Sequence, residues 1–171
     1  MTDSEQSKIS LEPKKESERI IIIPIDKSEV SRRALDWYSN NMMKENDVVH
    51  LIHIVEPIYN TIAVGIGMEA AWLPMEELDA KIQKQIDKGK ALVREYISNL
   101  TDKGGKCKGF IRVDSRVGEC IISVCHDHLA DVILMANRGE GLLRRTFLGS
   151  VSDYVLHHAD KPVIIVPPLH R

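Results

Sequence analysis

The sequence predicts a single-domain α/β protein built on a five-stranded, doubly wound parallel sheet with helices on both faces. Several short segments are apolar at every position, as strands are when both faces of their sheet are covered. The segments between them repeat apolar residues at intervals of three and four, as amphipathic helices do. Because strands and helices alternate along the chain, crossover connections and a parallel sheet are expected.

Five segments are predicted to form the strands. Four are apolar almost throughout, and Pro162 and Pro167 bound the last of them. The remaining segment is less apolar and is therefore expected at an edge of the sheet. The apolar strands are residues 20–26, 48–55, 131–136 and 163–166, and the weaker one is 109–113.

Helical periodicity predicts four helices between these strands. Ser28 is a candidate N-cap for the first, and Gly104–Gly105 is expected to close the second, a long helix over about 75–100. Ser150 with Asp153 has the form of a capping box at the start of the short fourth helix. The expected core-facing positions of the third helix are Gly118, Ile121, Ile122, Cys125 and Leu129.

Composition excludes several classes of protein. The net charge is −2 over 171 residues, so the whole chain offers no basis for binding nucleic acid or an anionic membrane. No apolar run approaches the roughly 20 residues of a membrane helix. The polar residues 1–18 are expected to form a disordered tail without a signal sequence, ahead of one domain over 19–171. A cytoplasmic protein is therefore expected, and its three cysteines lack the spacing of a disulfide framework or zinc site.

The candidate ligand site lies where parallel strands end, because open α/β sheets bind ligands at their carboxyl edge. The ends that point there are 24–26, 54–57 and 135–139. Gly139 allows a tight exit from a buried strand, and Gly149 allows close approach of backbone. Ser150 opens a helix, whose free N–H groups attract an anion, and Ser152 adds a second hydroxyl. Two backbone turns thus predict a phosphate-binding cradle without a P-loop lysine.

These motifs, in this order, resemble the universal stress protein family over residues 19–168. That family carries Gly-x-x-Gly, nine residues and Gly-Ser/Thr at its last two strand-to-helix junctions. The matching segments here are Pro24-Ile25-Asp26, His53-Ile54-Val55, Ala130-Asp131-Val132-Ile133-Leu134-Met135, Leu148-Gly149-Ser150-Val151-Ser152-Asp153-Tyr154 and Pro162-Val163-Ile164-Ile165-Val166.

The resemblance implies a Rossmann-like fold that binds ATP, with AMP or ADP as alternatives and Mg²⁺ held through the phosphates. Asp26 would lie near the ribose or the metal, and backbone at Ile54 or Val55 would contact the adenine edge. The last strand, Val163–Val166, would pair two copies into a homodimer. The residues implied to line the nucleotide site are Pro24, Ile25, Asp26, Ile54, Val55, Met135, Ala136, Arg138, Gly139, Gly149, Ser150, Val151 and Ser152.

Ala136 departs from the family pattern, which has the first glycine of Gly-x-x-Gly at this position. If the position requires a positive φ, alanine costs about 1 kcal/mol or more. If glycine is needed for closeness to the sugar, the methyl group crowds the ligand. A family member that has lost nucleotide binding and acts only as a dimeric interaction scaffold is therefore a second hypothesis.

Simpler roles compete for several of these residues. Asp26 has the position of a helix cap, and Arg138 that of a solvated arginine. The stretch 65–70 matches GxGxxA but follows the wrong strand for a dinucleotide fingerprint, and is interpreted as a loop. The histidines at 126 and 128 are expected at a helix end facing solvent. His53 is interpreted as a core histidine beside the cleft.

No motif in the sequence assigns catalysis. The chain has no nucleophile elbow, paired carboxylates or metal triad, and it lacks the HIGH and KMSKS signatures of nucleotidyl transfer. The favoured function is an adenine-nucleotide-binding stress-response or regulatory protein with an unidentified protein partner. Slow ATP hydrolysis stays open as a lesser alternative.

Overall fold

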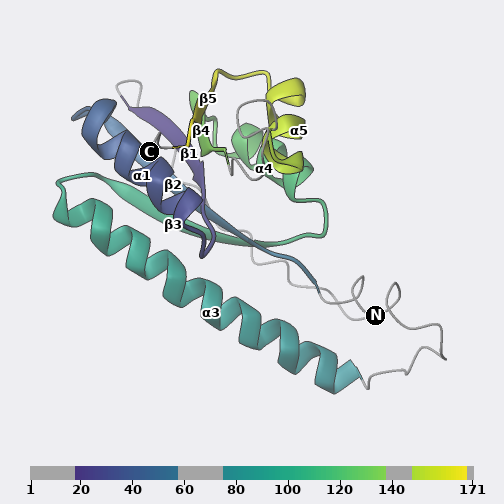
Figure 1. The fold of residues 1–171 in the computed structure, drawn as a ribbon. Coiled ribbons are helices and arrows are strands. Elements are labelled where there is room, and N and C mark those ends of the chain that lie inside the picture. The colour runs from purple at the N-terminus through teal and green to yellow at the C-terminus, as the bar shows by residue number, and fades with distance from the viewer. Residues whose placement is uncertain (1–17, 58–74, 138–147, 169–171) are drawn as a thin grey trace.

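The computed structural model of the chain describes residues 18–57, 75–137 and 148–168. Strands and helices alternate along it as predicted (Figure 1). The elements are β1 Arg19–Pro24, α1 Glu29–Asn41, β2 Asp47–Val55, α3 Met75–Asp102, β3 Cys107–Val113, α4 Val117–Asp127, β4 Val132–Ala136, α5 Ser150–His158 and β5 Val163–Val166.

The five strands form one parallel sheet in the order β3-β2-β1-β4-β5. The weakly apolar β3 is at one edge, as predicted, and β5 is at the other. The chain moves outward from β1 to β3 and then returns to β4, so the strand order reverses between β1 and β4. This is the position at which such sheets bind ligands.

Two cores cover the two faces of the sheet, as predicted for a doubly wound fold. Ile21 and Ile23 pack toward α1 and α3, whereas Ile20 and Ile22 pack toward α4 and α5. Alternate residues of a strand point to opposite faces, so an uninterrupted isoleucine run supplies both cores at once. Burying an isoleucine side chain stabilises the fold by roughly 1.5–3 kcal/mol.

The long helix α3 ends where the sequence predicts. Gly104 has φ +84°, and the Gly105 amide donates to the Leu100 carbonyl at 2.9 Å, which is the bond of a Schellman C-cap. The N-cap Ser28 is also confirmed, because its hydroxyl oxygen accepts from the Ser31 amide at 3.3 Å.

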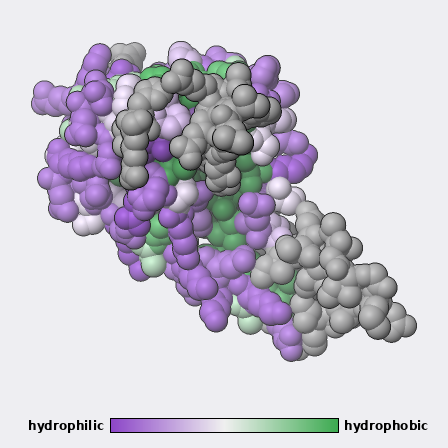
Figure 2. Space-filling model, in the orientation of Figure 1, coloured by the Kyte–Doolittle hydropathy of each residue, from purple (hydrophilic) through white to green (hydrophobic). Residues whose placement is uncertain are grey.

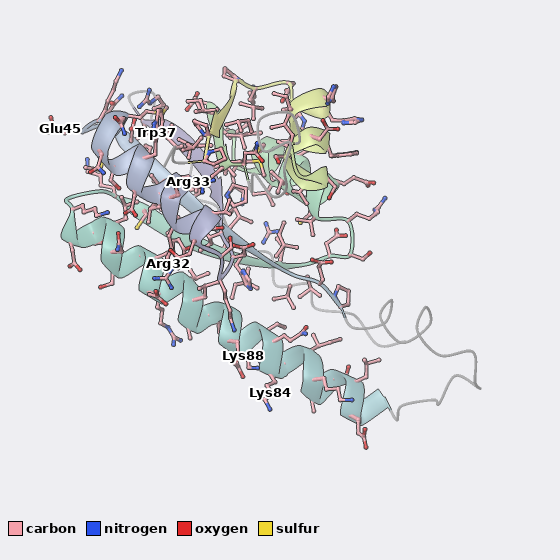
Figure 3. The ribbon with its side chains drawn as sticks, in the orientation of Figure 1. Arg32, Arg33, Trp37, Glu45, Lys84 and Lys88 are labelled. Carbon is pink, nitrogen blue, oxygen red and sulfur yellow. The ribbon has the colours of Figure 1, made fainter. Side chains whose placement is uncertain are left out.

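The outer surface of α3 is polar. Lys84 and Lys88 point from α3 away from the sheet (Figure 3). On the face drawn in Figure 2, hydrophilic residues cover most of the described surface and hydrophobic ones show mainly in narrow gaps. No helix among the described residues is both long and apolar enough to cross a membrane.

Three local predictions are wrong. The N-cap of α5 is Gly149 rather than Ser150, so Ser150 and Asp153 form no capping box. Leu129 lies outside the core face of α4, since the helix ends at Asp127 and Leu129 is 63% exposed. His128 is buried rather than solvent-facing, because tertiary contacts with β2 and β3 cover it. The expected tail, the 65–70 loop, Arg138 and Gly139 lie outside the described residues.

Candidate functional site

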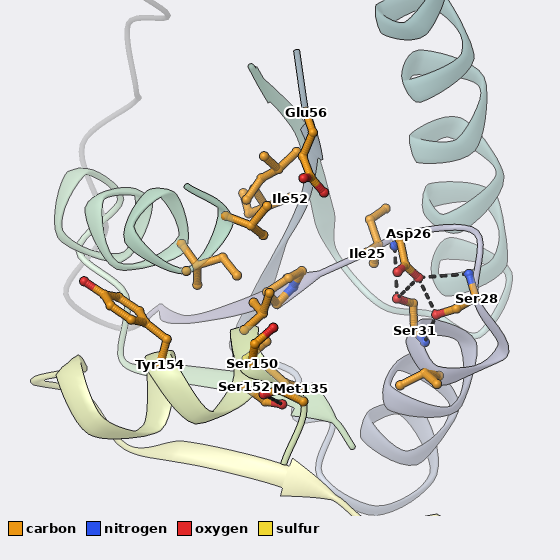
Figure 4. A pocket seen from close by; sticks show the side chains of 18 of the residues that line it. Ile25, Asp26, Ser28, Ser31, Ile52, Glu56, Met135, Ser150, Ser152 and Tyr154 are labelled. Carbon is orange, nitrogen blue, oxygen red and sulfur yellow. Dashed lines mark hydrogen bonds between the residues drawn. The ribbon is translucent and has the colours of Figure 1, made fainter. Parts of the chain in front are cut away.

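A cavity of about 640 Å³ lies at the carboxyl edge of the sheet, over the ends of β1, β2 and β4 (Figure 4). The first turns of α1, α4 and α5 complete its wall. Its size is within the range of small-molecule sites in proteins. The cavity is therefore at the place where the reversed strand order predicts a ligand.

Most of the residues predicted for the site line this cavity. Val55 does not: its side chain is buried and its carbonyl accepts from the Asp114 amide at 3.1 Å. The predicted residues that line the wall are Pro24, Ile25, Asp26, Ile54, Met135, Ala136, Gly149, Ser150, Val151 and Ser152.

Asp26 is held by the first turn of α1. Its Oδ1 accepts hydrogen bonds from the Ser28 amide at 2.9 Å, from the Ser28 hydroxyl, and from the Ser31 hydroxyl at 2.7 Å (Figure 4). Asp26 is therefore not the N-cap of α1, which is Ser28 two residues later; its carboxylate instead holds the cap residue in place. This role is compatible with ligand binding, because Asp26 also lines the cavity.

The backbone that leads from β1 to Asp26 is fixed by neighbours on β2 and α3. The Ile25 amide donates to the Ile52 carbonyl at 2.8 Å, and His53 Nδ1 lies 3.0 Å from the Ile25 carbonyl. A carbonyl can only accept, so His53 carries its proton on Nδ1. The Tyr96 hydroxyl donates to the Asp26 carbonyl at 3.1 Å. This wall is therefore preorganised, and His53 is a partly buried histidine beside the cleft, as predicted.

The N-terminus of α5 faces the cavity, and no side chain among the described residues caps it. The first intrahelical bond runs from the Asp153 amide to the Gly149 carbonyl at 2.9 Å, so the amides of Ser150, Val151 and Ser152 precede it. The Ser152 hydroxyl donates to the Gly149 carbonyl at 3.0 Å, so that proton is engaged within the protein. The helix start therefore offers backbone N–H groups, rather than this hydroxyl, to an anion.

Gly149 is not required to be glycine by the protein's own packing. Its φ is −60°, which any residue adopts, and among the described residues an added Cβ would meet only the Ser152 hydroxyl, at 3.7 Å. Gly149 itself lines the cavity. A glycine at this position therefore suits the close approach of a ligand to the backbone.

Ala136 fits its position without backbone strain. Among the described residues, Leu129 is the non-glycine residue with a positive φ, and Ala136 does not have one. The chain that leaves β4 after Ala136 is held in place. The Asn137 amide donates to the Val166 carbonyl at 3.0 Å, and Arg33 donates to the Asn137 carbonyl. The strain considered for alanine here is absent, and only its methyl group in the cavity wall distinguishes it from glycine.

We expect Ala136→Gly to change the affinity for AMP by less than about threefold, because the backbone already has an ordinary conformation. The variant should lose up to about 1 kcal/mol of stability through the added freedom of its unfolded chain. Calorimetric titration and urea unfolding measure the two effects. A tenfold gain in affinity would show instead that the methyl group crowds the ligand.

The first turn of α4 forms a wall that sequence reasoning missed. Arg116, Gly118 and Glu119 line the cavity here, and Arg116 forms an ion pair with Glu119 at 2.5 Å. Gly118 lets the ring of Tyr154 approach, since a Cβ at Gly118 would lie 2.6 Å from Tyr154 Cδ1. The sequence does carry a signal for this wall. Ligands bind where parallel strands end, and this applies to the exit of β3 as well, whereas the sequence prediction uses β3 only as an edge strand.

Carboxylates outnumber cationic side chains on the described part of the wall. Asp26, Glu56 and Glu119 carry negative charge there, and Arg116 carries positive charge. Within the described ranges, no group of three or more His, Cys, Asp or Glu side chains could hold a metal by itself. The wall would therefore hold an anion through helix N-termini, and its carboxylates favour a cation that accompanies the anion.

Comparison with known proteins identifies relatives of the same fold. A model of the universal stress protein family matches residues 18–167. The universal stress protein MJ0531 of Methanocaldococcus jannaschii is 31% identical over 148 residues, which are 85% of this chain and 80% of that protein. The solved structure of MJ0577 has a TM-score of 0.71 and 24% identity, over 91% of this chain and 99% of that one.

Two further solved structures contain a nucleotide. A universal stress protein from Arabidopsis thaliana with AMP bound has a TM-score of 0.59 and 18% identity, over 86% of this chain and 90% of that one. The universal stress protein from Archaeoglobus fulgidus in complex with dAMP has a TM-score of 0.59 and 19% identity, over 87% and 97%. At these identities the likeness establishes the shared fold.

Proposed function

This chain belongs to the universal stress protein family, and from that premise we propose that it binds an adenine nucleotide, ATP or its relatives AMP and ADP, in the cavity at the carboxyl edge of its sheet. One observation carries the proposal. The N-terminus of α5 presents uncapped backbone amides to the cavity at Gly149, where a missing side chain leaves space for a ligand. The AMP and dAMP complexes of other proteins with this fold support the same ligand class.

The proposed arrangement places the phosphates at the start of α5. Backbone N–H groups of Ser150, Val151 and Ser152 bind phosphate oxygens there, assisted by the positive end of the helix dipole. Arg138 and Gly139, which the sequence also predicts for the phosphate site, lie outside the described residues. No lysine is needed, because the anion is held by peptide dipoles.

The sugar and base take the other wall of the cavity. Asp26, already fixed by Ser28 and Ser31, faces the ribose or a cation beside the phosphates. Backbone at Ile54 contacts the adenine edge, and the apolar side chains of Ile52 and Met135 suit the flat faces of a base. Mg²⁺, when present, is shared between phosphate oxygens and a carboxylate such as Asp26, as is usual for this ion.

The proposal includes a homodimer formed through β5. In the described sheet β5 pairs with β4 on one side only, and Val163, Ile164 and Ile165 are partly exposed. An apolar edge strand offers unpaired backbone groups to a second strand. Two copies that pair their β5 strands would cover these groups. Sedimentation equilibrium gives the mass of the particle in solution, which distinguishes a dimer from a monomer.

The proposed role is regulatory binding in the cytoplasm. Nucleotide binding would raise the free energy of unfolding by an amount that grows with the logarithm of the ligand concentration divided by Kd. It would also change the surface around the cavity. Of the two grounds for the scaffold hypothesis at Ala136, the ordinary φ of that residue removes backbone strain, and Ala136→Gly tests crowding by the methyl group.

Calorimetric titration of the full chain with AMP, ADP and ATP, each with and without Mg²⁺, tests the proposal. We expect saturable one-to-one binding, with GMP weaker than AMP because Ile54 contacts the base edge. A tighter Kd for ATP with Mg²⁺ than without would support a carboxylate-shared cation. Absence of heat up to millimolar nucleotide, with no shift in melting temperature, would contradict the function and favour the scaffold.

A further inference from the structure

A second polar cluster lies on the face of the sheet that α4 and α5 cover. It consists of His50 on β2, Phe110 on β3 and His128 immediately after α4, which are 5%, 6% and 3% exposed. The two histidines meet through their Nδ1 atoms, 2.9 Å apart. The Phe110 and His128 rings meet edge to face with centroids 4.4 Å apart. The cluster thus joins the C-terminal end of α4 to β2 and the edge strand β3.

The contact between the histidines holds only while at least one ring is neutral. At 2.9 Å one Nδ1 carries a proton and donates it, and the other accepts it with its lone pair. If both rings were protonated, two N–H groups would face each other. His128 Nε2 is also buried and has no hydrogen-bond partner among the described residues, so a proton there would be unsatisfied.

The surroundings of the pair favour the neutral rings. Burial, assisted by the charges of His128 and Lys108, lowers the pKa of His50 from its usual 6.5 to about 4. Burial also lowers the pKa of His128, assisted by Arg112 and opposed by Asp127. On the β1 side of this core, Ile20 and Ile22 carry no charge.

The backbone after His128 is in an unfavourable conformation. Leu129 has φ +51°, in the left-handed region that leucine rarely adopts, and its side chain is 63% exposed. The Ala130 amide donates to the Cys125 carbonyl at 2.9 Å, which closes the turn in the manner usually served by glycine. Because Leu129 itself is not buried, the contacts of its neighbours, including His128, must hold this turn closed.

We propose that the His50–His128 pair is a proton-binding site that acts as an acid-sensitive latch: proton uptake separates the two rings, releases α4 from the sheet and weakens nucleotide binding. The coupling rests on the proposed function, because the opposite end of α4 supplies Arg116, Gly118 and Glu119 to the cavity wall. A helix that spans from the latch to the cavity transmits movement of one end to the other.

The direction of the effect follows from proton linkage. Between about pH 6.5 and pH 4, an opened state takes up protons that the latched state excludes, so the latched state loses stability as pH falls through this window. For His50 alone, the ratio of opened to latched molecules rises about 20-fold from pH 7 to pH 5. Well above pH 6.5 neither state takes up a proton at this site, so the equilibrium no longer depends on pH.

Hydrogen exchange and nucleotide titration at pH 7 and pH 5 test the proposal together. After correction for intrinsic exchange rates, we expect the protection of α4 amides to fall about 20-fold at pH 5, while α1 on the opposite face changes little. The Kd for AMP should rise over the same interval. In the double variant His50→Asn/His128→Asn, the two amides occupy the place of the Nδ1 contact without titrating, so both losses should shrink to below about threefold. Each single variant keeps one titrating histidine and should lose less than the wild type.

His126→Asn is the matched control, because His126 lies in the last turn of the same helix but is exposed. It should behave as the wild type. The latch is overturned if the protection of α4 amides does not depend on pH, or if it falls by the same factor in the wild type and in the double asparagine variant. Release of α4 with an unchanged Kd overturns the coupling. If AMP does not bind at pH 7, the proposed function and its coupling to the latch are both overturned. Hydrogen exchange of the α4 amides then still tests the latch by itself.

A measurement on the wild-type chain covers the case in which the variants do not fold. Histidine ring resonances should show His50 titrating below its usual pKa of 6.5, with α4 signals changing as it titrates. Titration of both rings near pH 6.5 without change in α4 overturns the proposal.

Discussion

Gly149→Asp is expected to weaken the binding of adenine nucleotides at least about 100-fold while leaving the domain as stable as the wild type or slightly more stable. The introduced carboxylate stands at the N-cap of α5, where it accepts from the amides that the phosphates would use and repels the phosphate charge. Its Cβ meets only the Ser152 hydroxyl at 3.7 Å, so no steric penalty is expected. Aspartate in place of an uncapped glycine is favourable for the helix itself.

Gly149→Asn is the matched control for this experiment. Asparagine has nearly the same size and is an equally good N-cap, but it carries no charge. We expect it to weaken binding about tenfold by competing for the amides, so the difference between the variants measures the electrostatic contribution. Titration calorimetry gives the affinity and thermal unfolding gives the stability. If Gly149→Asp bound nucleotides with wild-type affinity, the start of α5 would not be the phosphate site.

Asp47→Ala is expected to lower the free energy of unfolding by about 3–5 kcal/mol. The Asp47 carboxylate, 1% exposed, accepts from Arg19 Nε at 2.7 Å, from Arg19 Nη2 at 2.8 Å and from the Tyr38 hydroxyl at 2.9 Å. Removing the carboxylate leaves a guanidinium and a buried hydroxyl without their acceptor. Asp36→Ala removes an exposed ion pair with Lys103 and should cost less than about 1 kcal/mol, which makes it the control.

The contribution of Asp47 also has a pH dependence of known sign. Burial on its own raises the pKa of Asp47, but hydrogen bonds from Arg19, Tyr38 and the Lys44 amide outweigh it and hold the pKa below its usual 3.8. The stabilisation is therefore complete above pH 3.8 and is lost as pH falls through the lowered value. Urea unfolding below pH 4 should show this acid loss in the wild type and not in Asp47→Ala; an equal loss in both would contradict it.

The fold was predictable because the signals for it are local. A run such as Ile20–Ile23 is apolar at every position, and only a strand between two helical layers buries all of it. The predictions that were wrong concern choices between adjacent residues or contacts with distant ones. Gly149 and Ser150 are both acceptable at a helix start, and the local sequence does not decide which is the cap.

Burial of individual polar residues was not predictable in the same way. His126 and His128 lie two positions apart at one helix end, yet one is exposed and the other has His50 and Phe110 as neighbours. Arg19 and Asp47 are 28 residues apart, and their contact exists because β1 and β2 pair in a register that places them side by side. Nothing in the local sequence of either residue indicates its partner.

By itself, the sequence determined the order of strands and helices, the two-sided burial of the sheet and the strand ends that line the cavity, because hydrophobic periodicity and glycine positions act over a few residues. Only the tertiary structure decided that α4 completes the cavity wall, that Ala136 needs no left-handed conformation and that His128 is paired and buried. These outcomes depend on which distant segments meet, and that is set by the free energy of packing the whole domain.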